Sequence, residues 1–248
     1  MTVSIASYAF HGLHREGKMD VFGYLESVRY RYHLNTADIW NGMFPNIEMD
    51  FLKKLKEGLE VRDMTLENLC VDGPHIWDDD PDVREEHYQQ ALDYLKAAKF
   101  LNAKTIRMDA GGQGDVFSDE QFDLIVKRYK EYAQIAYDHG FKVGPENHWG
   151  PENIPANMVK ICEAVDHPGF GVLLHFKSPE GDKKIAPYAM HTHISWEATQ
   201  DHLADKLNML HATGYTGSYS VEHHSAQNEY HEVSIQLAAV QNIMASWE

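Results

Sequence analysis

The segment Gly171-Val172-Leu173-Leu174-His175-Phe176 decides the fold class, because it is a short and almost continuous apolar run. Runs of this kind are typical of parallel strands that are buried on both faces. Helical periodicity lies on either side of it, over Ile154–Val165 before the run and Gln200–Thr213 after it. Short β-rich runs that alternate with longer helical stretches predict βα units and a parallel sheet.

The same alternation extends over the whole chain and gives eight βα units. The expected strands are Val3–Ala9, Thr36–Trp40, Thr65–Val71, Thr105–Met108, Lys142–Glu146, Gly171–Phe176, Met190–Ile194 and Tyr219–Glu222. The expected helices cover about Asp20–Tyr32, Glu48–Arg62, Pro81–Phe100, Ser118–Gly140, Ile154–Val165, Ile185–Tyr188, Gln200–Thr213 and Glu232–Ser246. Eight consecutive units favour a closed barrel over an open doubly wound sheet. We therefore predict an α/β protein, with a single (β/α)8 TIM-barrel domain over residues 1–248.

The composition limits the classes of function. The 38 acidic residues outnumber the 22 Lys and Arg residues, and the formal net charge is −16. Because the sequence has no basic cluster, we expect no nucleic acid or membrane partner. The sequence shows no signal peptide and no apolar run of about 20 residues. Cys70 and Cys162 are too few for a disulfide framework. Together these observations lead us to expect a soluble cytoplasmic protein.

Residues of the metal-binding type are concentrated at the carboxyl ends of the expected strands. Glu146, His175, His193 and Glu222 come from four neighbouring strands. The loops at these strand ends build the active site of such a barrel. Imidazole nitrogens and carboxylate oxygens are ligands for manganese, magnesium or cobalt. As a set, the four residues predict a site for one divalent metal ion that leaves positions open for two substrate oxygens.

Each residue of this set also has an ordinary explanation when it is taken alone. A glutamate at the end of a barrel strand is often solvated or ion-paired. His175 interrupts an apolar run, where a buried ring requires a hydrogen bond or a metal. His191 and His193 alternate on one strand and face the same side, so one can be a ligand and the other its neighbour or a substrate contact.

Further residues after the strand ends are candidates for catalysis or substrate binding. His148 lies two residues after Glu146 and can act as an acid or base, or bind a backbone carbonyl as an ordinary loop residue. Arg107 can bind a substrate oxygen or pair with Asp109. Aromatic faces suit the apolar side of a sugar ring, although they also pack loops together. The expected substrate-binding residues are Arg107, His191, Trp149, Trp196, His11 and Lys177.

The chain resembles the xylose isomerase-like superfamily of barrels, the sugar phosphate isomerase/epimerase group. The resemblance rests on four segments in order: Pro145-Glu146-Asn147-His148, Gly171 to His175, His191-Thr192-His193 and Val221-Glu222. In that group Glu, Asp, His and Glu usually hold the metal, so the resemblance implies Glu146, His175, His193 and Glu222 as ligands here. His175 stands in place of the Asp, and Ser195-Trp196 stands where relatives often carry Lys-Asp.

The resemblance also implies a cofactor and an assembly. One divalent metal ion is expected, with Mn2+ favoured and Co2+, Mg2+, Zn2+ or Fe2+ as alternatives, because His in place of Asp lowers the negative charge and softens the site. Barrels of this superfamily often form homo-oligomers, and a second subunit could supply a lid.

The resemblance implies chemistry next to a metal-bound carbonyl in carbohydrate metabolism. Glu146 and Glu222 would lie on opposite sides of the metal, so that one removes a proton and the other returns it through an enediolate. The leading hypothesis is an isomerase or epimerase of a sugar or keto-sugar. The alternative is a lyase or dehydratase that expels a β-substituent, including cleavage of 3-keto-glycosides. A phosphodiester hydrolase is disfavoured by the acidic charge, and a noncatalytic barrel that needs a partner also remains open.

Overall fold

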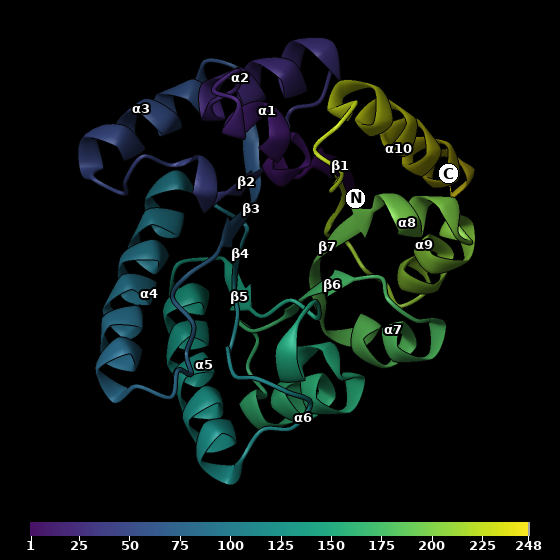
Figure 1. The fold of residues 1–248 in the computed structure, drawn as a ribbon. Coiled ribbons are helices and arrows are strands. Elements are labelled where there is room, and N and C mark those ends of the chain that lie inside the picture. Colours follow the sequence, from purple (N-terminus) through teal and green to yellow (C-terminus); the bar gives the residue numbers. More distant parts are fainter. Residues whose placement is uncertain (248) are drawn as a thin grey trace.

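Eight parallel strands form the ring expected from the sequence in the computed structural model, which describes residues 1–247. The strands are β1 (Thr2–Ile5), β2 (Thr36–Trp40), β3 (Thr65–Val71), β4 (Thr105–Met108), β5 (Lys142–Gly144), β6 (Val172–His175), β7 (Ala189–Ser195) and β8 (Ser218–Glu222). They pair in the orders β1-β8-β7-β6 and β2-β3-β4-β5. Single bridges from Ala6 to Asp38, Val143 to Phe170 and Glu146 to Leu173 close the two seams. The predicted TIM barrel is confirmed (Figure 1).

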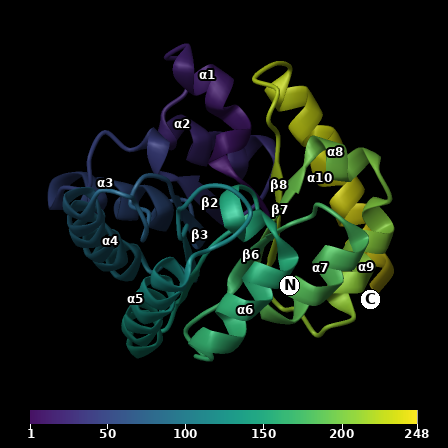
Figure 2. The same cartoon turned by 60° about the horizontal axis from the view of Figure 1, so that its bottom comes forward.

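Helices surround this ring on the outside (Figure 1). They are α1 (His11–Arg15), α2 (Val21–Glu26), α3 (Met49–Glu60), α4 (Pro81–Leu101), α5 (Asp119–Asp138), α6 (Pro155–Val165), α7 (Pro179–Ile185), α8 (Trp196–Gln200), α9 (Leu203–His211) and α10 (Glu229–Met244). The carboxylate of Glu229 accepts hydrogen bonds from the backbone N–H groups of Gly12 and Leu13, so α1 is fixed to the start of α10 (Figure 2). None of the described helices has the length and apolar character needed to cross a membrane.

Several element boundaries differ from the sequence prediction. The first strand ends at Ile5 instead of Ala9, because Ser7–Phe10 turns into a 3-10 helix whose Ser7 Oγ accepts a hydrogen bond from the Trp40 backbone N–H. The helix expected over Ile185–Tyr188 begins earlier, at Pro179, where the Ser178 side chain caps it. The short helices α1 and α8 were not predicted. Both lie directly after strand-end segments, where tertiary contacts rather than a long apolar periodicity stabilise one or two turns.

The seam between β5 and β6 determines where two candidate site residues emerge. A Cβ atom on Gly144 would lie 1.7 Å from the carbonyl oxygen of Gly171, so only glycine allows this approach of the two backbones. Beyond the end of β5, the Asn147 side chain takes the place of backbone hydrogen bonds between the strands. Its Oδ1 accepts a hydrogen bond from the His175 N–H at 2.7 Å, and its Nδ2 donates one to the His175 carbonyl at 2.8 Å. The seam therefore holds Glu146 and His175 at adjacent strand ends.

Candidate functional site

A cavity of about 560 Å³ opens at the carboxyl ends of the strands. Most of the residues expected to form the site line this cavity, namely Arg107, Glu146, His148, His175, Lys177 and Glu222. Tyr8 and Trp40 form part of its aromatic wall, with ring centroids 5.0 Å apart in an edge-on arrangement. The position agrees with the rule that TIM-barrel active sites occupy this face.

Three side chains meet at the centre of the site. His193 Nδ1 lies 3.4 Å from Glu146 Oε1 and 3.3 Å from Glu222 Oε1. His193 is 1% exposed and Glu146 is 3% exposed, so this contact is shielded from solvent. His193 Nδ1 makes no hydrogen bond to any of the described residues. The three ligand atoms lie within 4.8 Å of one another, which is a spacing that one metal ion can bridge.

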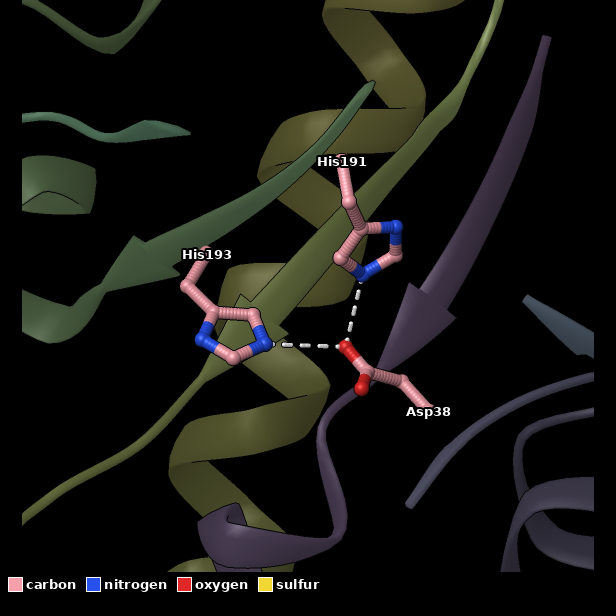
Figure 3. Close-up of side chains that lie close together, drawn as sticks. All are labelled: Asp38, His191 and His193. Carbon is pink, nitrogen blue, oxygen red and sulfur yellow. Dashed lines mark hydrogen bonds and ion pairs between the residues drawn. The ribbon is translucent and has the colours of Figure 1, made fainter. Parts of the chain in front are cut away.

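The other nitrogen of His193 is held by a buried aspartate on β2. Asp38 Oδ2 accepts hydrogen bonds from His193 Nε2 at 3.0 Å, His191 Nε2 at 2.8 Å and Ser220 Oγ at 2.7 Å. Its Oδ1 accepts a fourth hydrogen bond from Asn68 Nδ2 at 2.9 Å. Figure 3 shows both imidazole rings directed at the same carboxylate oxygen. Asp38 therefore fixes the orientation of the His193 ring.

His175, expected as a fourth ligand, approaches the centre through Glu222. Its Nε2 lies 3.6 Å from Glu222 Oε2, and the same oxygen accepts a hydrogen bond from His224 Nε2 at 2.8 Å. His175, Glu222 and His224 form a second group whose ligand atoms lie within 4.8 Å of one another. The two oxygens of Glu222 thus face different partners, with Oε1 towards His193 and Oε2 towards His175 and His224.

Arg107 is held by the protein on several sides. Its Nη1 lies 2.7 Å from Asp109 Oδ2 and 2.8 Å from Asp72 Oδ1, and its Nη2 lies 2.7 Å from Cys70 Sγ. Its Nε lies 3.3 Å from Glu146 Oε2. Of the two roles considered from the sequence, the pair with Asp109 is present, and the guanidinium also sets the position of the Glu146 carboxylate.

The electrostatics of the centre favour charged carboxylates around one imidazole. Burial raises the pKa of Glu146, but His148 and His193 lower it more, so the net pKa lies below the usual range. The pKa of Glu222 is also well below its usual range, because His193 and the neighbouring imidazoles outweigh its burial. Burial lowers the pKa of His193, whereas Glu222, Asp38 and Glu146 raise it well above the usual value. Without a metal ion, His193 therefore keeps a proton on Nδ1.

His148 lies beside Glu146 at the edge of the cavity. Its Nδ1 is 3.4 Å from Glu146 Oε2, and its Nε2 is 3.9 Å from Asp109 Oδ2. The side chain is 30% exposed, so it can reach both the carboxylate and a bound molecule. Glu222 and His224 repeat this i, i+2 arrangement at the end of β8.

The remaining predicted residues lie elsewhere. His191 is 1% exposed and is bound to Asp38, so the structure does not bring it to the cavity wall. His11 stacks on Tyr8 at 4.4 Å, behind the aromatic wall. Trp149 lines a separate loop pocket, and Trp196 packs against His223. Lys177 lines the cavity and is exposed.

Sequence reasoning missed two contributors to the centre, Asp38 and His224. Asp38 lies within a strand, whereas the predicted site residues lie at strand ends and in the loops after them. A signal was present, since Asp38 is a charged residue inside the apolar strand Thr36–Trp40, and burial of a charge requires partners. His224 repeats the Glu-x-His spacing of Glu146 and His148, which also could have been noticed.

Comparisons with known proteins agree with this fold. The family model described as "Xylose isomerase-like TIM barrel" matches residues 28–242. A solved D-tagatose 3-epimerase-like protein has a TM-score of 0.77 and 15% identity, covering 100% of both chains. The probable 3-DHS dehydratase AsbF from Bacillus anthracis has a TM-score of 0.75 and 15% identity, covering 98% of this chain and 99% of the other.

D-psicose 3-epimerase from Clostridium cellulolyticum H10 gives a TM-score of 0.74 at 17% identity, and covers 99% of this chain and 97% of its own. No curated protein sequence matches the chain significantly. At these identities the solved structures establish likeness of fold.

Proposed function

Because the chain belongs to the xylose isomerase-like TIM barrel family, we propose that it is a divalent-metal-dependent isomerase or epimerase of a sugar or keto-sugar. The proposed reaction moves a proton at a carbon next to a carbonyl group. A solved sugar epimerase and an epimerase-like protein with the same fold support a sugar as the substrate. The cavity of about 560 Å³ has room for one sugar molecule.

One observation carries the metal-dependent part of the proposal. His193 Nδ1 is buried, lacks a hydrogen-bond partner in the described chain and lies 3.3 to 3.4 Å from two carboxylate oxygens. A lone pair facing two carboxylates is repelled, so this nitrogen carries either a proton or a cation in front of it. A metal ion satisfies all three groups at once. Two carboxylates and imidazole are ligands that manganese accepts readily.

Glu146, His193 and Glu222 would hold the metal, with His175 available as a fourth ligand beside Glu222. The metal would supply polarisation of the substrate carbonyl, which makes the neighbouring C–H bond acidic. The protein contributes the ligand geometry, because Asp38 fixes the His193 ring and Arg107 fixes the Glu146 carboxylate.

Two carboxylate oxygens remain for proton transfer. Glu146 Oε2 and Glu222 Oε2 point away from His193, and each has a histidine beside it, His148 at 3.4 Å and His224 at 2.8 Å. One carboxylate would take the proton from the substrate carbon, and the other would return a proton to that carbon or its neighbour. Two carboxylate bases, each with a histidine beside it, suit epimerisation, which needs proton transfer at two faces of the substrate carbon.

A lyase is the second candidate function. His148 is partly exposed in the cavity and could donate a proton to a leaving oxygen after Glu146 has removed the proton from carbon. The C–H electron pair would then form a C=C bond as the β-substituent departs with its own bonding pair. The solved dehydratase with the same fold supports this alternative.

The first test is metal content. We would measure it by elemental mass spectrometry on the wild type and the Glu146→Gln, His193→Ala and Glu222→Gln variants, after loading with Mn2+ and dialysis. Near one equivalent in the wild type, lost in the variants, is the expected result. The matched control is Glu197→Gln, which changes an acidic cavity residue outside the metal group and should retain the metal. Absence of metal from the loaded wild type would refute the proposal.

The second test separates isomerase from lyase. The Mn2+-loaded enzyme would be incubated with ketoses and 3-keto-glycosides in D2O and the products followed by NMR. Deuterium at the carbon next to the carbonyl, in a product of unchanged composition, identifies the isomerase or epimerase. Release of the substituent together with an unsaturated ketone identifies the lyase.

A further inference from the structure

The Asp38 carboxylate is the most fully hydrogen-bonded acidic group beneath the site. It is 0% exposed and comes from β2, whereas His191 and His193 come from β7. In the order of the ring, β1 and β8 separate these two strands. The Asp38 side chain therefore points into the barrel and contacts both histidines of a strand that is not its neighbour (Figure 3).

The contacts of Asp38 leave no room for a metal ion on the carboxylate oxygen that faces the two histidines. Its Oδ2 already accepts from His191, His193 and Ser220, and its Oδ1 accepts from Asn68. A carboxylate oxygen has two lone pairs, so three donors leave no free position on Oδ2, the oxygen that both histidines contact. The group Asp38, His191 and His193 is therefore a hydrogen-bonded cluster, although its atoms are close enough to suggest a cation site.

An ionised carboxylate can only accept hydrogen bonds, so it fixes where the proton of each histidine lies. His193 Nε2 must carry hydrogen to bond to Asp38 at 3.0 Å. The nitrogen that can lose its proton is then Nδ1, which faces Glu146 and Glu222 at 3.4 and 3.3 Å. Without Asp38, the proton could stay on Nδ1, where it would point at both carboxylates and exclude a metal ion.

We propose that Asp38 is a positioning residue, which holds the proton on His193 Nε2 and so presents the Nδ1 lone pair to a divalent cation between Glu146 and Glu222. This inference rests on the proposed function, because it concerns the same metal site. Carboxylate partners of metal-bound histidines act in this way in many proteins, and their loss typically weakens metal binding about 10- to 100-fold.

The test uses Asp38→Asn, which keeps the size of the side chain. In either orientation the amide NH2 group of this variant meets a donor, either Asn68 on one side or the histidines and Ser220 on the other. We expect Mn2+ affinity, measured by calorimetry, to fall about 10- to 100-fold. The matched control Ser220→Ala removes one donor to the same oxygen and leaves the contact with His193, so it should bind Mn2+ like the wild type.

A spectroscopic measurement on the wild type separates positioning from a merely structural role. Nitrogen-15 NMR of the Zn2+-loaded, histidine-labelled protein, assigned with His193→Gln, should show hydrogen on Nε2 and the metal on Nδ1. Hydrogen on Nδ1 would overturn the role of Asp38, whether or not the Asp38→Asn variant folds. Unchanged Mn2+ affinity in folded Asp38→Asn would overturn it too. A wild type that binds neither metal would instead overturn the proposed function, and this role with it.

Discussion

Metal binding to the site should be strongly pH-dependent, because the metal ion has to displace a proton from His193. Its pKa is well above the usual value: burial lowers it, but Glu222, Asp38 and Glu146 raise it more. The pKa values of Glu146 and Glu222 are lowered by the imidazoles around them despite burial, so both are already ionised. Binding should therefore release one proton, from His193 Nδ1.

The sign and the size of the effect follow from this exchange. Below the raised pKa, His193 is protonated in the metal-free protein, and the apparent affinity rises about tenfold for each pH unit, or about 1.4 kcal/mol. Above that pKa the affinity becomes constant. The same proton stabilises the metal-free fold below its raised pKa, and this contribution is lost as the pH rises through it.

The assay is calorimetric titration with Mn2+ at pH 6, 7 and 8, in pairs of buffers with different ionisation heats, which counts the protons released. His224 also has a raised pKa: burial lowers it, but Glu222 raises it more, so its proton could contribute. The matched variant His224→Gln removes that source and should keep a release near one proton. An affinity that does not change with pH in this variant would refute the assignment of the Nδ1 proton.

Three further predictions concern stability. Gly144→Ala should destabilise the fold by about 3 kcal/mol or more through overpacking against Gly171, whereas Gly23→Ala, whose Cβ has only ordinary contacts, should not; chemical denaturation measures both. Arg107→Met should cost about 3 to 5 kcal/mol because it leaves buried Asp109 without its partner, and an unchanged denaturation midpoint would contradict this. Free Mn2+ at 100 times its Kd should add about 2.7 kcal/mol, seen as a Tm that falls when a chelator is added.

Much of the fold could be predicted, because each βα unit carries its own local pattern. Apolar runs such as Val172–Leu174 and the capped start of α5 at Ser118 are decided by neighbouring residues. The seams of the barrel are different, since the pairing of Ala6 with Asp38 depends on residues that are distant in sequence. The first strand was predicted to be too long, because its end also depends on a residue distant in sequence. Its end is set by a hydrogen bond between Ser7 and Trp40.

The site could be predicted in part, because strand ends meet at one face of a barrel whatever the packing details. In agreement with this rule, the ligand atoms of Glu146, His193 and Glu222 lie within 4.8 Å of one another. The rule could not decide between His191 and His193, which lie on the same face of β7, although only His193 contacts the two glutamates. Both histidines contact Asp38 on the distant strand β2, a pairing that no local pattern around β7 indicates.

The buried charge of the site gives an independent reason for a divalent ion. The carboxylates of Asp38, Asp109, Glu146 and Glu222 are each less than a tenth exposed, and the Arg107 guanidinium compensates for only part of their charge. A proton on His193 adds one positive charge, whereas a divalent ion that replaces this proton adds two. Burying unpaired charge is costly, so the exchange should be favourable once the pH allows the proton to leave. The exchange brings the summed charge of these groups closer to zero while Glu146 and Glu222 remain ionised, which is the state in which a carboxylate can accept a proton from carbon.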